Sequence, residues 1–236
     1  MQTVGQYGVD TFDLRETLFS TATDKESLFF KTDHHWTAPT AFLAYTQLTA
    51  MLQERYGLVL DPDGFYTNIE NWQKTEFPNS YLGSLGRRVG QVVSGLDDYT
   101  FISPRFNTDY TLYNGLTDRE KPAFEGDFMT AIAKPDILNS EDVEANKHAA
   151  YFEWDYGNLI IKNHLAENDT KIMLIKDSYS LPLAAFLSTC VSELHMIDMR
   201  EAGTSPTQYI AENDIDMVIV LYNAEGFENK MFDFLR

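Results

Sequence analysis

The last third of the chain opens with KIMLIKD (171–177) and continues with SLPLAAFLSTC (180–190), ELHMID (193–198), SPTQYIAEN (205–213) and DIDMVIVLYN (214–223). The first, third and fifth of these segments are rich in Ile, Val, Leu and Met, which is typical of strands buried on both faces. The two segments between them have the length and composition of helices. Strands that alternate with helices predict a βαβαβ unit, in which a parallel sheet is covered by helices. We therefore expect an α/β fold with this unit, residues 170–225, at its core.

The front part of the chain predicts a long helix. Thr37 is a plausible N-cap and Pro39 fits the first helical turn. Apolar residues recur at helical spacing over 42–56, and Gly57 is a typical helix end. TDHHWT (32–37) therefore lies in the loop that leads into the N-terminus of this helix.

Residues 58–130 differ in composition from the rest of the chain. Short aromatic or β-branched pieces, such as DYTFIS (98–103) and DYTLYN (109–114), alternate with turns rich in Gly, Asn, Asp and Ser. This pattern predicts antiparallel hairpins, and we expect the segment to be an insertion within one domain that spans 1–236. We also expect a short strand at 9–14, a helical or turn segment at 13–20 and a strand or hairpin at 151–163.

The composition excludes several classes of protein. The formal net charge of −18 repels phosphate, so nucleic-acid binding is excluded and binding to anionic membranes is disfavoured. Cys190 is the single cysteine, so an intramolecular disulfide is impossible. The sequence has no apolar run of about 18 residues and no signal peptide. It opens MQTVGQYGVDTFDLRETL, which resembles the interior of a domain, and we expect an N-terminal part with any targeting segment to be missing.

Three predicted strand ends carry side chains that can do chemistry, because ligands of open α/β sheets bind beyond the carboxyl ends of the strands. These ends read KDSYS (176–180), IDMR (197–200) and YNA (222–224). Ser180 is the better N-cap for the helix that follows, which leaves Ser178 as the unexplained hydroxyl. A serine on a tight strand-to-helix turn is where a nucleophile is exposed, although capping is the commoner role of such a serine.

Asp33 and His35 supply what Ser178 lacks. A hydroxyl is a poor nucleophile unless a base removes its proton, and that base works best when an acid fixes its tautomer. Asp33 and His35 can serve as this acid and base, with His34 pointing elsewhere. The residues alone leave a second interpretation open, in which the histidines belong to a well-packed turn and Trp36 lies in the core.

A metal site is the third interpretation of Asp-His-His. The same letters mark a class of manganese phosphoesterases, whose sites need further Asp and His ligands in separate acidic motifs. The remaining histidines, His148, His164 and His195, lie in no ligand motif. We therefore expect no metal and no cofactor.

Other polar residues are candidates for binding a substrate or an oxyanion: Gly83, Ser84, Arg87, Tyr179, Arg200 and Asn223. GSLGRR (83–88) lacks the glycine spacing of a phosphate loop. It is either a hairpin turn with solvated arginines or a loop that lines the cleft, with Arg87 placing an anionic or polyhydroxyl ligand. Arg200 and Asn223 follow core strands, and each is explained equally well by a capping role.

TDHHWT (32–37) and LIKDSYS (174–180) together resemble a known family. The chain is similar to the bacterial DHHW proteins, which are related to the SGNH-hydrolase-like proteins of alginate O-acetylation. Four other stretches also resemble this family: YLGSLGRRVG (81–90), DDYTFISP (97–104), ELHMIDMR (193–200) and VIVLYN (218–223). The resemblance implies an SGNH-hydrolase-like parallel sheet flanked by helices.

The resemblance also implies a function. Asp33 would be the orienting acid, His35 the base and Ser178 the nucleophile that passes an acetyl group to a sugar hydroxyl or to water. The implied protein is an O-acetyltransferase or acetylesterase of an extracytoplasmic polysaccharide, located at the cell surface or anchored to the membrane, with a membrane acyl-donor protein as a further partner. The nucleophile loop reads Lys-Asp-Ser rather than the family's Gly-Asp-Ser, so Asn223 and the Gly83 loop are only candidate oxyanion donors. The alternative is a glycan-binding module for cell-envelope assembly on the same fold, with a vestigial triad.

Overall fold

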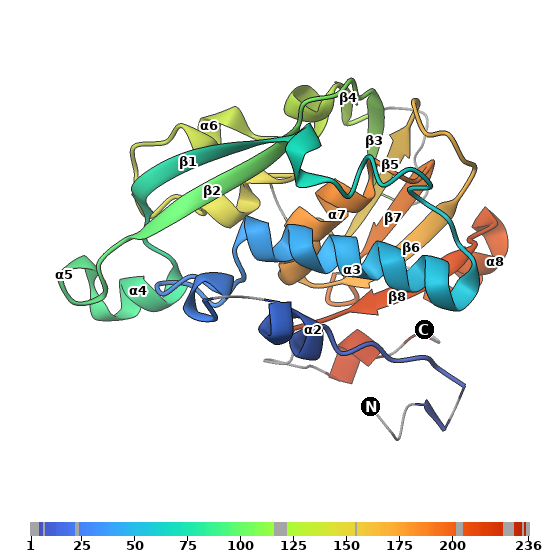
Figure 1. Cartoon of the computed structure of the whole chain (residues 1–236), viewed down its shortest axis with the longest axis horizontal. Helices are drawn as coiled ribbons and strands as arrows, with labels where there is room; N and C mark the ends of the chain where they lie inside the picture. The colour runs from blue at the N-terminus through green and yellow to red at the C-terminus, as the bar shows by residue number, and fades with distance from the viewer. Residues whose placement is uncertain are drawn as a thin grey trace.

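The computed structural model describes residues 5–6, 8–21, 24–115, 122–153, 155–201, 205–223, 229–232 and 234. Within these residues, six strands form one sheet in the order β4-β3-β5-β7-β6-β8 (Figure 1). The strands are β3 (Tyr110–Asn114), β4 (Phe124–Gly126), β5 (Asn158–Asn163), β6 (Lys171–Lys176), β7 (Glu193–Ile197) and β8 (Met217–Leu221). The molecule is a mixed α/β structure in which this sheet is flanked by helices.

The C-terminal part forms the expected βαβαβ unit. β6, α7 (Leu181–Leu187), β7, α8 (Pro206–Asn213) and β8 follow one another along the chain. β6 pairs in parallel with both β7 and β8, so it lies in the middle of the unit. Ile172 to Ile175 in β6 are at most 2% exposed, which explains why this strand is an uninterrupted apolar run in the sequence.

The resemblance implies a parallel sheet, but only part of the observed sheet is parallel. β7 pairs antiparallel with β5, β5 with β3, and β3 with β4. The parallel arrangement is therefore confined to β6, β7 and β8, where helical crossovers connect the strands. The strands β3, β4 and β5 lie outside this unit, and their antiparallel pairing needs no helical crossover.

The segment 58–130 is only partly separate from the main sheet. β1 (Trp72–Tyr81) and β2 (Asp97–Pro104) form an antiparallel pair of their own, with α4 (Ser84–Val89) and α5 (Gln91–Ser94) between them. Figure 1 shows this pair extending to the left, away from the main sheet, with α4 and α5 at its end. β3 and β4 also lie within 58–130, but they join the main sheet. Residues 58–130 therefore contain both a separate hairpin and two strands of the main sheet, which turn-rich sequence does not distinguish.

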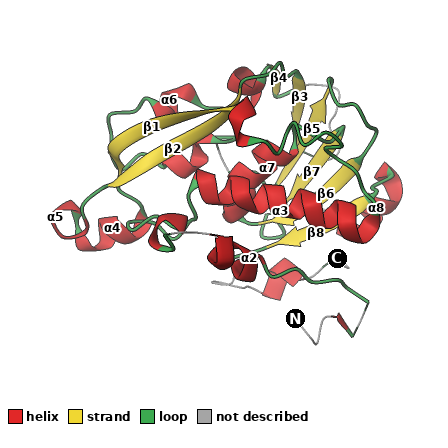
Figure 2. Cartoon of the chain, viewed as in Figure 1, coloured by secondary structure: helices red, strands yellow, loops and turns green. Residues whose placement is uncertain are grey.

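The two faces of the sheet bury different sets of side chains. Ile172 and Leu174 of β6 belong to the large core, which includes α3 (Ala38–Tyr56) and α7. Met173 and Ile175 point to the opposite face, where a smaller cluster includes Tyr209 of α8. Figure 2 shows α3 and α7 in front of the strands and α8 at the far edge of the sheet.

The long helix α3 begins and ends as the sequence predicts. Thr37 is its N-cap residue, Pro39 lies in the first turn, and Gly57 ends it in the left-handed conformation with φ of 67°. The Thr37 side chain does not cap the helix; its hydroxyl donates to the carbonyl of Ser27. Residues 9–13 form no strand, while α2 (Leu14–Thr21) matches the helical segment expected there.

The remaining helical elements are short. They are α6 (Pro135–Leu138), the 3-10 turns at Glu26–Leu28, Ile69–Asn71, Lys147–Ala150, Ser178–Ser180 and Asn229–Phe232, and a π-helical turn at Phe128–Ile132. None of the helices in the described part of the chain combines the length and apolarity needed to cross a membrane.

Candidate active site

The turn after β6 places Ser178 at the carboxyl edge of the parallel strands. Asp177 caps the short turn Ser178–Ser180, because its Oδ1 accepts a hydrogen bond from the N–H of Tyr179 at 3.0 Å. Its Oδ2 accepts a second bond from the N–H of Asn223 at 2.7 Å, which ties the loop after β8 to the same turn. Burial raises the pKa of Asp177, and these two hydrogen bonds offset only part of that effect. Asp177 therefore has a structural role in the turn, because its carboxylate bonds to the backbone of Tyr179 and Asn223 and not to Ser178.

The structure brings Ser178, His35 and Asp33 together. His35 Nε2 lies 2.9 Å from Ser178 Oγ, and His35 Nδ1 lies 2.5 Å from Asp33 Oδ1. A carboxylate only accepts, so Nδ1–H donates to Asp33 and leaves Nε2 to accept from the serine hydroxyl. Asp33 and His35 are 4% and 6% exposed, so this hydrogen-bonded chain is shielded from bulk water.

Asp33 is held as a carboxylate in a fixed orientation. Its Oδ2 accepts from the N–H of Ser84 at 2.8 Å, and its Oδ1 also accepts from the N–H of His35 at 3.1 Å. Burial acts to raise the pKa of Asp33, but the hydrogen bonds from His35 and Ser84 outweigh it and hold this pKa well below its usual range. The site therefore contains a permanent negative charge behind the imidazole at neutral pH.

The loop that carries Asp33 and His35 is anchored at both ends. Asp97 of β2 accepts from the N–H groups of Lys31 and Thr32 and from the Thr32 hydroxyl, at 3.0, 2.8 and 2.6 Å. Trp36 is buried, and its Nε1–H donates to the carbonyl of Tyr179 at 2.8 Å. Trp36 thus packs in the core and also ties the histidine loop directly to the serine turn.

Gly83 lies against Asp33 rather than in the cleft. A Cβ on Gly83 would meet Asp33 Cβ at 2.2 Å and the carbonyl oxygen of Thr32 at 2.7 Å, so only glycine fits here. The Gly83 N–H donates to the Thr32 hydroxyl at 2.8 Å. The expectation that Gly83 supplies an oxyanion donor therefore does not fit the structure, because this N–H already has a partner behind the carboxylate.

Ser84 and Arg87 also lie outside the space next to Ser178. The Ser84 hydroxyl is 3.1 Å from His34 Nδ1, while its N–H supports Asp33. Arg87 donates from Nη1 to the carbonyl of Glu144 at 2.9 Å and is exposed. GSLGRR therefore forms the beginning of α4 rather than a hairpin turn or a cleft loop, and it supports the histidine loop from behind.

Ser178 lies between two cavities. The first, of about 320 Å³, is lined by His34, Asp177, Ser178, Tyr179, Arg200, Asn223 and Met231. The second, of about 360 Å³, is lined by His35, Ile137, Ala145, Asn146, His148, Ala149, Glu153, Asp155, Ser178 and Leu181. Three of the predicted binding residues, Tyr179, Arg200 and Asn223, thus line the first cavity together with the serine.

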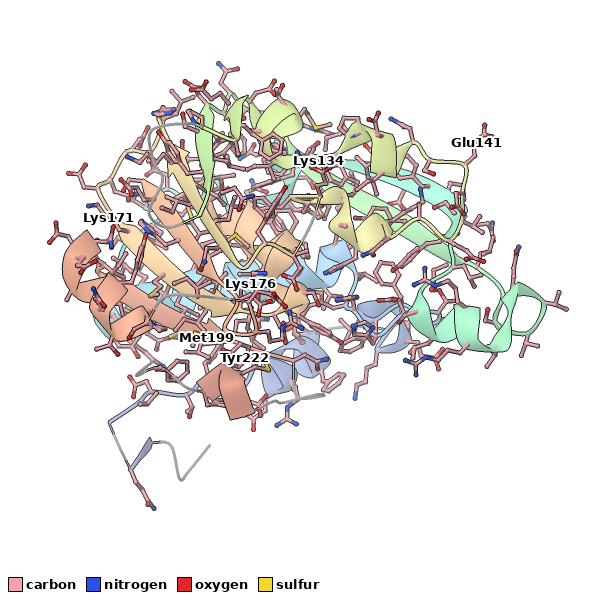
Figure 3. The ribbon with its side chains drawn as sticks, turned by 180° about the vertical axis from the view of Figure 1, so that it is seen from behind. Lys134, Glu141, Lys171, Lys176, Met199 and Tyr222 are labelled. Carbon is pink, nitrogen blue, oxygen red and sulfur yellow. The ribbon has the colours of Figure 1, made fainter. Side chains whose placement is uncertain are left out.

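Lys176 occupies the position where the family has glycine in its Gly-Asp-Ser motif. Its side chain is completely buried, and its ammonium group bonds to Asp155 and lies 3.6 Å from Asp198 Oδ2. In Figure 3, which views the molecule from behind, Lys176 lies near the centre, with Met199 and Tyr222 below it. A buried ammonium group needs carboxylate partners, and two of them are present here.

Arg200 belongs to the same charged cluster. Its Nη2 lies 2.6 Å from Asp155 Oδ2 and 2.5 Å from Asp198 Oδ2. Hydrogen bonding to Asp198 raises the pKa of Arg200 above its ordinary value. Burial acts to raise the pKa of Asp198, but the hydrogen bonds from Arg200 and the charge of Lys176 together outweigh it, so that this pKa is lowered. Arg200 is therefore a fixed cation on the wall of the first cavity.

His148 is the residue that sequence analysis missed. It is 3% exposed, its ring stacks on His35 with centroids 3.7 Å apart, and its Nε2 lies 2.7 Å from the carbonyl oxygen of Ser178. It lies in KHAA, a segment without a recognisable motif, and no sequence signal places it beside His35. The other two histidines lie in different contacts, His164 with Thr111 and His195 with Glu193 and Tyr209.

Asp33, His34 and His35 also have the composition of a metal site, with ligand atoms within 4.8 Å of one another. The hydrogen bonds argue for a different use. Asp33 Oδ1 and His35 Nδ1 bond to each other, and Asp33 Oδ2 is bonded to Ser84. A metal ion bound to these atoms would have to break the Asp33–His35 bond, so the arrangement favours proton transfer over metal binding.

Comparison with known proteins bears on this geometry. Residues 1–92 match the family model described as "SGNH hydrolase-like domain, acetyltransferase AlgX". The resemblance inferred from the motifs is confirmed. No curated protein matches the chain.

Three solved structures share the fold. A DHHW family protein from Eubacterium siraeum is 19% identical with a TM-score of 0.69, over 91% of this chain and 64% of that one, so the present chain spans less than two thirds of its length. Bacillus cereus PatB1 is 22% identical, with a TM-score of 0.73, over 94% of this chain and 72% of that one. A second structure of PatB1, with a sulfonyl adduct, is also 22% identical, with a TM-score of 0.72 over 94% of this chain and 69% of that one. These three similarities, all at 22% identity or less, show that the chain shares the fold of these proteins.

Proposed function

We propose that this protein is a serine-dependent acyl-ester enzyme, either an O-acetyltransferase or an acetylesterase, with Ser178 as the nucleophile. The observation that carries the proposal is the continuous hydrogen-bonded chain from Ser178 Oγ to His35 Nε2, at 2.9 Å, and from His35 Nδ1 to Asp33, at 2.5 Å. A nucleophile, a base and an orienting acid within hydrogen-bond reach are what acyl transfer through a serine requires.

The first half of the reaction forms an acyl-enzyme. His35 Nε2 takes the proton of the Ser178 hydroxyl as Oγ attacks the carbonyl carbon of the acyl ester. Asp33 accepts a hydrogen bond from Nδ1–H and stabilises the imidazolium that forms. The bond from the carbonyl carbon to the leaving oxygen then breaks, and that oxygen takes the proton from His35.

The second half releases the acyl group. A hydroxyl of the acceptor, or water, gives its proton to His35 and attacks the acyl carbon, and Ser178 regains its proton as the ester breaks. Which acceptor is used decides between transferase and esterase. Tyr179, Arg200 and Asn223 are the proposed substrate-binding residues because they line a cavity together with Ser178. Asn223 is the proposed oxyanion donor through its side-chain amide, since its backbone N–H is bonded to Asp177.

We further propose an extracytoplasmic polysaccharide or acetylated glycan as the substrate class. The chain would be a single domain of a full-length protein that is located at the cell surface or anchored to the membrane. The name of the matching family model includes an acetyltransferase. The polar lining of the first cavity, with a carboxyl, a guanidinium and an amide side chain, suits hydroxyl groups of a sugar. A membrane protein that supplies acyl groups is the proposed partner for the transferase reaction.

Reactivity of Ser178 tests the proposal. PatB1 has been solved with a sulfonyl adduct, and sulfonyl fluorides react with activated serine hydroxyls. The folded protein should gain one sulfonyl group on Ser178 when treated with phenylmethanesulfonyl fluoride, and it should hydrolyse 4-nitrophenyl acetate. Ser178→Ala should lose both reactions.

Ser180→Ala is the matched control, because Ser180 lies in the same turn and its hydroxyl donates to the carbonyl of Leu221 at 3.3 Å. It should retain both reactions. A folded wild-type protein that neither reacts at Ser178 nor turns over the ester would overturn the proposal. If such a protein still bound glycan, and Ser178→Ala bound it equally, the molecule would be a binding module instead.

A further inference from the structure

His148 contacts both reactive residues of the proposed serine site. Its Nε2 lies 2.7 Å from the carbonyl oxygen of Ser178, and its ring stacks on His35 at a centroid distance of 3.7 Å and an interplanar angle of 17°. The turn Lys147–Ala150 holds it in a buried position, 3% exposed. A side chain in this place can fix the position of the nucleophile's backbone and the plane of the base at once.

The hydrogen bond determines the tautomer of His148. A carbonyl oxygen only accepts, so Nε2 carries the proton and donates a hydrogen bond to the carbonyl oxygen of Ser178. Burial, and next the neighbouring His35, lowers the pKa of His148 to about 3, so the ring is neutral at pH 7. The titratable groups that face it are Asp33, His34 and His35, and Glu153 and Asp155 line the same cavity. A neutral ring stacks on His35 without charge repulsion when His35 becomes an imidazolium during the reaction.

We propose that His148 is a positioning residue of the serine site, whose Nε2–H fixes the Ser178 backbone and whose ring fixes the plane of His35. The expected effect of His148 on the reaction rate rests on the proposed function. Its expected effect on the geometry of Ser178 and His35 does not, because these contacts exist whether or not the protein turns over an ester. His148 supplies no proton and touches no substrate atom in the reaction.

Two substitutions separate the two contacts. His148→Gln keeps a side-chain N–H donor near the position of Nε2 and loses the stacked ring, whereas His148→Phe keeps a flat ring and loses the donor. We expect each variant to react at Ser178 with phenylmethanesulfonyl fluoride about 10- to 100-fold more slowly than wild type, because small displacements of reacting atoms have effects of this size. With an acetyl ester, kcat should fall by a similar factor while KM changes by less than about twofold.

His164→Gln is the matched control. His164 is exposed and bonds Thr111, away from both cavities, so this variant should react as wild type does. Thermal unfolding of each variant establishes that the protein is folded at the assay temperature. The reaction rate of either folded His148 variant is then sufficient to test the positioning role. Wild-type rates in a folded His148→Phe or His148→Gln protein would overturn the proposal.

Crystal structures of the variants provide a test that does not depend on activity. In His148→Phe the Ser178 backbone should shift, and in His148→Gln the His35 ring should rotate, so that the 2.9 Å contact between His35 Nε2 and Ser178 Oγ is lengthened in both. An unchanged contact in both variants would overturn the positioning role. A lengthened contact in variants of a protein whose wild type is unreactive would support the positioning role and contradict the proposed function.

Discussion

At the residue scale, the geometry of the proposed serine site depends on how tightly Asp33 is surrounded. One carboxylate receives the His35 ring, the His35 N–H and the Ser84 N–H, and Gly83 lies close enough to exclude any Cβ. The hydrogen bonds fix the direction of both carboxylate oxygens. This direction places the proton of the neutral His35 ring on Nδ1. Nε2 is therefore unprotonated and accepts the hydrogen bond from the Ser178 hydroxyl.

Removing the charge of Asp33 tests its role. Asp33→Asn keeps the size of the side chain, but the amide cannot hold the His35 tautomer that leaves Nε2 free. We expect kcat/KM for an acetyl ester to fall by about 10³- to 10⁴-fold. Asp136→Asn, at the exposed start of α6, is the control and should leave kcat/KM unchanged. A loss of less than tenfold in Asp33→Asn would contradict the assignment of Asp33 as the orienting acid.

Adding one carbon at Gly83 tests the support behind Asp33. Gly83→Ala places a Cβ 2.2 Å from Asp33 Cβ and 2.7 Å from the Thr32 carbonyl oxygen. Backbone must shift to accommodate it, and we expect the free energy of unfolding in urea to fall by about 1–3 kcal/mol, with reduced Ser178 reactivity. Ser84→Ala is the comparison, because it removes only the hydroxyl and keeps the N–H that bonds Asp33. Equal free energies of unfolding for Gly83→Ala and wild type would contradict this prediction, because they would show that the backbone around Thr32 and Asp33 accommodates the added Cβ at little cost.

The burial of His148 predicts a pH dependence of stability. Its pKa is near 6.5 in the unfolded chain and is lowered to about 3 in the folded protein. The unfolded state therefore binds a proton first as the pH falls, and the stability contributed by neutral His148 is complete above about pH 6.5 and is lost between there and pH 3. The slope expected from this group is at most about 1.4 kcal/mol per pH unit.

Urea unfolding of wild type and His148→Phe from pH 7 to pH 4 measures this contribution. The difference between the two curves should shrink as the pH falls, since Phe has no proton to bind. A constant difference across this range would show that His148 is not kept neutral by the fold.

At the element scale, the β1–β2 pair supports the site from outside the main sheet. Asp97 at the start of β2 accepts three hydrogen bonds from Lys31 and Thr32, and α4, between the two strands, supplies Ser84. A segment that looks like an elaboration in the sequence therefore holds the Asp33–His35 loop in place. The β1–β2 segment therefore supports the Asp33–His35 loop without contacting a substrate, because its residues line neither cavity beside Ser178.

Removing the anchor at Asp97 should weaken this support. Asp97→Ala leaves the N–H groups of Lys31 and Thr32 without their acceptor, and we expect the free energy of unfolding to fall by about 2–3 kcal/mol. Asp98→Ala is the matched control, because the exposed Asp98 accepts one bond from the N–H of Asn79. It should change stability by less than about 1 kcal/mol. Equal losses in the two variants would contradict the anchoring role.

At the scale of the whole molecule, the proposed site is assembled from segments that are far apart in the sequence. Asp33 and His35 precede α3, His148 lies between β4 and β5, and Ser178 follows β6. The Trp36 bond to Tyr179 and the stack of His148 on His35 join these segments directly. The site should therefore exist only while the whole core is folded.

This dependence predicts a single transition. In urea, Ser178 reactivity toward the sulfonyl fluoride should be lost over the same concentration range as the tertiary fluorescence of the tryptophans. Coincident curves would also support the proposal of one domain. Loss of reactivity at a clearly lower urea concentration would show that the histidine loop opens before the core unfolds.

The sequence by itself determined the βαβαβ unit and the long helix after DHHW, and it supplied Asp33, His35 and Ser178 as candidates for a serine site. Apolar runs, helical periodicity and the chemistry that a serine requires are properties of short segments, so they can be recognised without knowing what packs against them. The family resemblance added the pairing of the two motifs.

Only the tertiary structure decided the rest. It placed β3 and β4 in the main sheet, gave the buried Lys176 its carboxylate partners, set Gly83 behind Asp33 and stacked His148 on His35. Each of these features depends on which distant segment approaches which, and local sequence carries no signal of that approach. The sequence could thus name a serine, a base and an acid, while the packing of the folded chain decided what holds them in place.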